Sequence, residues 1–144
     1  MNRSLIGRSY MQVATKTASP GQLVLMLYDG AIRFLEGALR GFGLEDPAES
    51  NATINDNVQR AQAILDELNA ALNMGAGGEF AEKLRGLYTY LDRRLFESNM
   101  RKEAEGIEEV VIRLSTLRDA WREMLAGTAS ADTVPERAGL VAVG

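Results

Sequence analysis

The sequence predicts an all-α protein, an antiparallel up-and-down four-helix bundle. Three observations carry this prediction: four stretches have apolar residues at helical spacing, none of the three prolines lies inside such a stretch, and no stretch reads as a strand of useful length. A chain of 144 residues with 46% apolar residues is large enough to bury one core. We therefore divide it into a non-helical or short-helical N-terminal leader (1–18), a helical bundle (19–126) and a flexible tail (127–144).

Capping residues mark the starts of the first two helices. Ser19 is the expected N-cap of the first helix, and Pro20 suits its first helical position. Asp46 and Glu49 have the spacing of a capping box, in which Asp46 accepts a hydrogen bond from the backbone and Glu49 reaches back. The first helix is expected to end near Arg40, before a glycine-containing turn.

The last three helices each carry one apolar stripe. The second helix is expected to end near Asn73, because the glycine-rich residues 75–78 stop it, and the third and fourth are expected over about 79–99 and 102–126. At about 100° per residue each stripe falls within roughly 120° of the helix circumference. The stripe residues are Ile54, Val58, Ala61, Ile64, Leu65, Leu68 and Leu72; Phe80, Leu84, Leu87, Tyr88, Leu91 and Leu95; and Ile107, Val110, Leu114, Leu117, Trp121, Met124 and Leu125.

The first helix has more apolar surface than the other three. Its apolar residues sweep through roughly 200° of the circumference, whereas a bundle helix buries a stripe only a little over 100° wide. Two explanations are open: the helix lies centrally and touches all three others, or part of its surface is a groove for another chain. Under the second explanation, the edge that receives the partner comprises Leu25, Tyr28, Ile32 and Leu35.

The segment before the first helix looks like an arm that lies on the bundle. Residues 1–18 carry three basic residues and no acidic one, whereas residues 44–69 carry six acidic residues against one basic residue. Tyr10 is the best candidate for an anchor, because an aromatic side chain has a large apolar area and a polar handle. Val13 is a second apolar residue in this segment. A disordered leader with incidental apolar residues is the alternative.

A few side chains fall outside the expected pattern. Tyr90, Phe96 and Met100 lie away from the apolar stripe of the third helix, and Ile112 lies away from that of the fourth. Single exposed apolar residues are ordinary in soluble proteins, so most of these need no functional explanation. Arg118 lies inside the apolar stripe of the fourth helix, where a buried guanidinium needs a carboxylate or carbonyl partner.

The composition excludes several classes of function. The chain has no cysteine and no histidine, which rules out disulfides, thiolate nucleophiles, Cys/His zinc sites and Ser–His–Asp triads. A net charge of −4 and 6% aromatic residues argue against nucleic-acid binding. No export signal or bilayer-spanning run is recognisable, so we expect a cytoplasmic protein without membrane insertion. Carboxylates alternate with basic residues, as on solvated helix faces, so we expect neither an enzyme nor a cofactor.

The run from Thr17 to Leu35, TASPGQLVLMLYDGAIRFL, resembles the signature of the flagellin export chaperones, the FliS family. Further blocks over 61–68, 87–99 and 107–121 resemble its later helices in the same order, and the upstream Tyr10 and Val13 stand where the family keeps a tyrosine-containing leader. Thr89 and Ser98 stand where the third helix of the family usually has aspartate and alanine. Neither replacement removes apolar surface.

The resemblance implies a bundle that binds the disordered C-terminal segment of newly made flagellin, its client. It implies that the protein prevents premature polymerisation and delivers flagellin to the flagellar type III export gate, and that some members bind an anti-sigma factor. We expect a monomer or weak dimer. The alternative is a helical homo-oligomerisation or regulatory interaction module. The expected client-binding residues are Tyr10, Val13, Leu25, Tyr28, Ile32, Leu35 and Tyr90.

Overall fold

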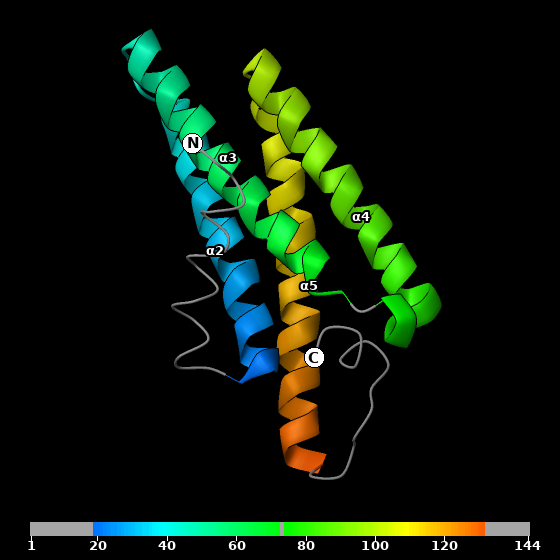
Figure 1. The fold of residues 1–144 in the computed structure, drawn as a ribbon. Helices are drawn as coiled ribbons and strands as arrows, with labels where there is room; N and C mark the ends of the chain where they lie inside the picture. Colours follow the sequence, from blue (N-terminus) through cyan, green and yellow to red (C-terminus); the bar gives the residue numbers. More distant parts are fainter. Residues whose placement is uncertain (1–18, 73, 132–144) are drawn as a thin grey trace.

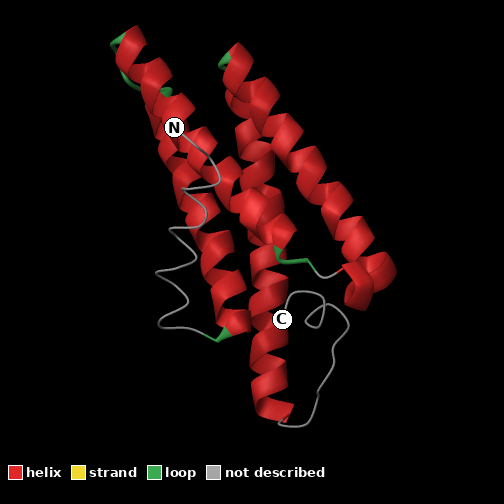
Figure 2. Cartoon of the chain, in the orientation of Figure 1, coloured by secondary structure: helices red, strands yellow, loops and turns green. Residues whose placement is uncertain are grey.

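The computed structural model of the chain describes residues 19–72 and 74–131 and contains four helices in that part (Figure 1). They are α2 (Pro20–Gly41), α3 (Pro47–Ala70), α4 (Met74–Arg101) and α5 (Ala104–Ala131). The described residues form no strand (Figure 2). The predicted leader and the last part of the predicted tail lie outside the described residues.

The helices run alternately up and down, as predicted (Figure 1). α2 packs against α3 and α5, and α4 packs against the same two helices. Within the described part of the chain, α2 and α4 are thus diagonal to each other, as are α3 and α5. This arrangement confirms the all-α antiparallel bundle. In backbone packing α2 has two neighbours, α3 and α5, and it reaches the diagonal helix α4 through the buried side chain of Tyr28.

Ser19 and Asp46 cap the first two helices as predicted, whereas the reciprocal bond from the Glu49 side chain stays a prediction. The Ser19 hydroxyl accepts a hydrogen bond from the backbone N–H of Gln22 at 3.3 Å. The Asp46 carboxylate accepts one from the backbone N–H of Glu49 at 3.2 Å. A proline follows each cap, where its missing N–H costs nothing because no helical acceptor exists there.

The connection before α4 differs in part from the prediction. Residues 75–78 are not a simple turn, because helical structure already begins at Met74. The backbone of Gly78, with φ 54° and ψ −130°, interrupts it, a conformation that glycine adopts without a steric penalty. The regular helix thus begins after Gly78, close to the predicted start at residue 79.

Two boundaries of the last helix also differ from the prediction. Lys102, the expected first residue of that helix, lies instead in the turn between α4 and α5 with φ 53°. Its Nζ donates to the backbone carbonyl of Asn99 at 2.7 Å and to the Asn99 side-chain oxygen at 2.6 Å. These bonds satisfy groups at the end of α4, where cations are favoured. α5 continues to Ala131, so residues 127–131 are helical and do not belong to the predicted tail.

The predicted stripes form the core, with one exception. Every predicted stripe residue of α3 is buried, and those of α5 are buried or packed against the core. Phe80 of α4 is wrongly predicted, since it is 44% exposed. The buried face of α4 runs through Ala81, Tyr88 and Leu95, a spacing of seven residues, and Phe80 is one position off that line.

Two polar contacts tie α5 to α2. The Trp121 indole N–H donates to the carbonyl of Gly21 at 2.9 Å. Arg118 is half-buried, and its guanidinium lies 3.4 Å from the Asp29 carboxylate and 3.1 Å from that of Asp119. The arginine in the apolar stripe thus has the carboxylate partners that its position requires.

Candidate functional site

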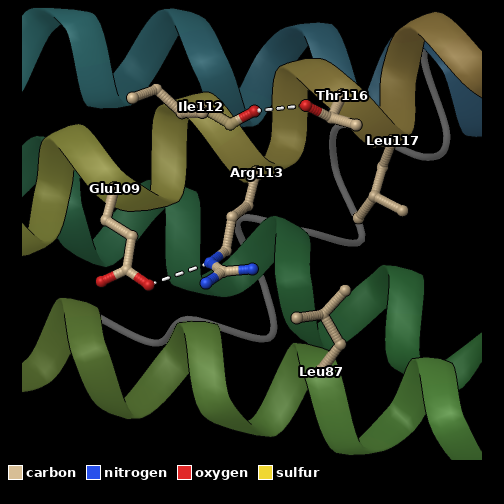
Figure 3. A pocket seen from close by; sticks show the side chains of 6 residues that line it. All are labelled: Leu87, Glu109, Ile112, Arg113, Thr116 and Leu117. Carbon is tan, nitrogen blue, oxygen red and sulfur yellow. Dashed lines mark hydrogen bonds and ion pairs between the residues drawn. The ribbon is translucent and has the colours of Figure 1, made fainter.

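A groove with a volume of about 360 Å³ lies between α4 and α5 (Figure 3). We call it the α4/α5 groove, and the residues that line it are Leu87, Glu109, Ile112, Arg113, Thr116 and Leu117. Leu87 and Leu117 are partly buried against the core and form its floor. Ile112 is 66% exposed, so a large apolar side chain is accessible to a partner.

The helical spacing of α5 explains why these side chains share one face. Ile112 and Thr116 are four residues apart and lie one above the other. The Thr116 hydroxyl donates to the Ile112 carbonyl at 3.1 Å, which satisfies the hydroxyl within its own helix. The open part of the groove is therefore mainly apolar.

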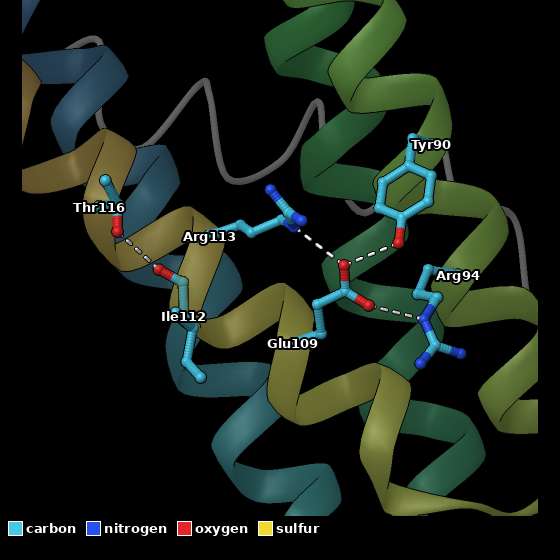
Figure 4. A network of polar contacts seen from close by, with 6 residues as sticks. All are labelled: Tyr90, Arg94, Glu109, Ile112, Arg113 and Thr116. Atoms are coloured by element: carbon cyan, nitrogen blue, oxygen red, sulfur yellow. Dashed lines mark hydrogen bonds and ion pairs between the residues drawn. The ribbon is translucent and has the colours of Figure 1, made fainter.

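A polar network closes one end of the groove (Figure 4). The Glu109 carboxylate accepts hydrogen bonds from the Tyr90 hydroxyl at 2.7 Å, from Arg94 Nε at 2.7 Å and from Arg113 Nε at 2.9 Å. The Arg113 guanidinium also lies over the Tyr90 ring, 5.8 Å from its centroid. The network links α4 to α5 and holds Arg113 beside the exposed Ile112.

The electrostatics of the network suit binding rather than proton transfer. The hydrogen bonds from Arg94, Tyr90 and Arg113 lower the pKa of Glu109 to about 2, so this group remains a carboxylate at neutral pH. The hydrogen bond to Glu109 raises the pKa of Tyr90, which stays a neutral phenol. The Arg113 guanidinium has N–H donors beyond the Nε that binds Glu109, and these can bind an acidic residue of a partner.

The predicted edge of α2 lies mostly in the core. Leu25 is partly buried, and Tyr28, Ile32 and Leu35 are only 3%, 4% and 0% exposed in the free protein. These three residues belong to the core cluster, and α2 packs against both α3 and α5. Contact of these residues with a client stays a prediction.

The buried hydroxyl of Tyr28 has a partner on the diagonal helix. It forms a hydrogen bond with the Tyr88 hydroxyl, which joins α2 to α4 across the interior of the bundle. Burial raises the pKa of Tyr28 to about 12 and also raises that of Tyr88. Both phenols therefore remain neutral, and the pair has a structural role.

The structure brings one predicted site residue, Tyr90, to the α4/α5 groove and separates it from the α2 edge. Tyr10 and Val13 lie outside the described residues. Sequence reasoning did not assign Ile112, Arg113 or Leu117 to a site. The available signal was that Ile112 and Tyr90 both fall off their stripes, but only the packing of α4 on α5 shows that they are neighbours.

Neither a metal site nor a membrane span emerges from the residues that the structure describes. No group of three acidic side chains in this part could hold a metal ion. None of the helices between residues 19 and 131 is both long enough and apolar enough to cross a bilayer.

The similarity to known proteins covers nearly the whole bundle. The sequence model of the family described as flagellar protein FliS matches residues 3–128. The chain belongs to the FliS family. This confirms the resemblance of the run from Thr17 to Leu35. The FliS match includes α2, α3 and α4, most of α5 and both sides of the α4/α5 groove.

Individual relatives support the same assignment to FliS. The flagellar secretion chaperone FliS of Salmonella typhimurium is 37% identical over 122 residues, which cover 81% of this chain and 87% of the relative. The protein of the same name from Campylobacter jejuni is 35% identical over 124 residues, with 86% and 94% covered. That from Bacillus subtilis is 32% identical over 117 residues, with 81% and 84% covered. All three are named as chaperones, which is not an enzyme class.

Proposed function

We propose that this chain is a cytoplasmic flagellar secretion chaperone that binds the disordered C-terminal segment of flagellin. By covering the apolar face of that segment, it prevents premature polymerisation and keeps the subunit competent for type III export. Membership of the FliS family and the names of the relatives support this proposal. Covering a surface requires no chemical step, so we expect no enzymatic activity.

The observation that carries the proposal is the exposed apolar side chain in the α4/α5 groove. An amphipathic helix binds such a groove with apolar residues at positions i, i+3 or i+4 and i+7. Ile112 and the floor residues Leu87 and Leu117 offer apolar contact. Arg113, held at the rim by Glu109, offers a charged hydrogen bond to an acidic residue of the client.

The groove alone is too small to account for useful affinity. A client that folds on binding loses roughly 2–5 kcal/mol to ordering, so a long contact is required. We propose that the client continues from the groove along the bundle surface. Of the residues expected to bind it, Tyr90 lies beside the groove and Leu25 is partly accessible on α2. Direct contact with Tyr28, Ile32 or Leu35 would require the client to displace whatever covers them.

The proposal is tested by calorimetric titration of the full chain with the flagellin C-terminal segment from the same organism. We expect saturable binding with a stoichiometry of one. A matched control segment with its apolar residues replaced by serine should not bind. Multi-angle light scattering distinguishes the chaperone from the rival oligomerisation module. A concentration-independent dimer that excludes the segment would refute the chaperone assignment.

The leader is tested separately through Tyr10. If the leader covers part of the client surface, Tyr10→Ala raises the fraction of open molecules and therefore the apparent affinity for the flagellin segment. The melting temperature should change little, because the core stripes are untouched. The same titration and thermal melts measure both quantities. An unchanged affinity would remove Tyr10 from the mechanism.

A further inference from the structure

The α4/α5 groove leaves apolar surface open in a chain that also carries a short apolar segment near its end. Residues 140–143 read Leu-Val-Ala-Val, and they follow α5, the helix that forms one wall of the groove. We propose that this segment folds back and occupies the α4/α5 groove of its own molecule.

The chain that follows α5 is long enough to reach the α4/α5 groove. α5 ends at Ala131, and Leu117 and Ile112 lie 14 and 19 residues before that end. At about 1.5 Å per helical residue they are roughly 21 and 28 Å back along the axis. An extended chain of about 3.3 Å per residue spans roughly 30 Å from residue 131 to 140 and roughly 40 Å to 143. The apolar segment can therefore return to the groove without strain.

The chemistry of the segment matches the groove. Pro135 cannot continue an α-helix without losing a hydrogen bond, so the chain is free to leave the direction of α5 there. Leucine and valine side chains fit an apolar floor of Leu87 and Leu117.

Phe80, 44% exposed, lies near the start of α4 and does not line the α4/α5 groove. Two further exposed apolar residues of α4 fit the segment less well. Phe96 and Met100 are 56% and 69% exposed, but they lie near the C-terminal end of α4. Because α4 and α5 are antiparallel, that end lies beside the start of α5 at Ala104 (Figure 1). The start is 27 residues from Ala131, about 40 Å away along the axis. The groove is nearer.

Attachment to α5 makes a weak contact effective. A short linker gives the segment an effective concentration in the millimolar range at the groove, so modest apolar contact is enough for occupancy. If the groove also binds flagellin, as the proposed function holds, the segment and the client compete for it. The docking itself does not depend on that function.

Paired cysteines test the docking directly, because the natural chain contains none. We replace exposed Thr116 in the groove and Val141 in the segment with cysteine in the full chain. The matched control keeps Val141→Cys and places the second cysteine at Asp56, an exposed position on α3. Circular dichroism verifies that both variants keep the helical content of the parent.

Under mild oxidation, without client, we expect the Thr116→Cys/Val141→Cys chain to form an intramolecular disulfide at least about tenfold faster than the control, as an effective-concentration difference predicts. Equal rates in the two variants would overturn the docking. Disulfide-linked dimers as the main product would also overturn it, because the segment would then occupy the groove of a second copy.

A second measurement separates the docking from the proposed function. Deleting residues 132–144 should increase the affinity for the flagellin segment if both occupy the groove. Selective cross-linking together with unchanged client affinity would uphold the docking and refute the placement of the client in the groove. Absence of selective cross-linking with normal flagellin binding would refute the docking and leave the chaperone assignment standing.

Discussion

The substitution Ile112→Ala tests whether the α4/α5 groove contacts the client. It removes most of the exposed apolar side chain in the groove while keeping a residue with high helix propensity. Ile112 is 66% exposed in the free protein, so most of its apolar surface is still available for burial on binding. The substitution should therefore act on client binding rather than on the bundle.

The size of the effect follows from that exposure. Full burial of an isoleucine side chain contributes about 1.5–3 kcal/mol. Two thirds of that value gives about 1–2 kcal/mol of binding free energy, or roughly a 5- to 30-fold increase in Kd. Competition by residues 140–143 would put the measured change at the lower end, because the segment loses the same contact. The free energy of unfolding should change by less than about 0.5 kcal/mol, as for other surface substitutions.

The assay is calorimetric titration with the flagellin C-terminal segment, accompanied by urea denaturation of each variant. Phe96→Ala is the matched control, because Phe96 is similarly exposed at 56% on α4 but does not line the groove. We expect its Kd to stay within about twofold of the parent value, since it loses no groove contact. Wild-type affinity for Ile112→Ala, or a larger loss for Phe96→Ala, would refute the placement of the client.

Three further predictions concern the bundle itself. The pKa of Glu109 is lowered to about 2 from an ordinary 4.5, so the group contributes stability above about pH 4.5 that is lost as the pH falls toward 2. Glu109→Gln should therefore reduce the fall of the melting temperature between pH 4.5 and 2. An equally steep fall in the variant and the parent would contradict this. Gly106→Ala brings a Cβ into the space of the Ser98 hydroxyl and should lower the free energy of unfolding by about 1–3 kcal/mol in urea denaturation. Wild-type stability would show that the Ser98 side chain moves aside freely. Ile32→Ala and Ile64→Ala should each lower the free energy of unfolding by about 2–5 kcal/mol in the same assay, and a loss below about 1 kcal/mol for Ile32 would argue against its burial.

Features determined by local interactions were predictable from the sequence. Ser19 and Asp46 cap helices through atoms three residues away, so a short window contains both partners. The stripes of α3 and α5 follow from helical periodicity, which a window of two or three turns reveals. The start of α5 was misplaced because the left-handed turn at Lys102 depends on bonds from its side chain to Asn99, and a lysine carries no turn signal of its own.

The site was less predictable, because it depends on which helices become neighbours. The wide apolar face of α2 left two explanations open from the sequence, and only the folded chain shows that Ile32 and Leu35 belong to the core cluster. Ile112 looked like an ordinary exposed residue within α5. Ile112 lies near Leu87 and the Glu109 network because of how α5 is rotated against α4. The sequence of either helix alone does not give this rotation.

The hydrogen bond between Tyr28 and Tyr88 places a joint condition on how this interior can vary. Converting either phenol to phenylalanine leaves the other hydroxyl in the core without that bond, a cost of about 1–3 kcal/mol, whereas converting both removes the polar atoms together and can be nearly neutral. Substitutions at these two positions, which are 60 residues apart in the sequence, should therefore occur together. A lineage that loses one hydroxyl is under pressure to lose or restore the other, so coordinated replacement at two distant sites is the expected evolutionary trace of this contact.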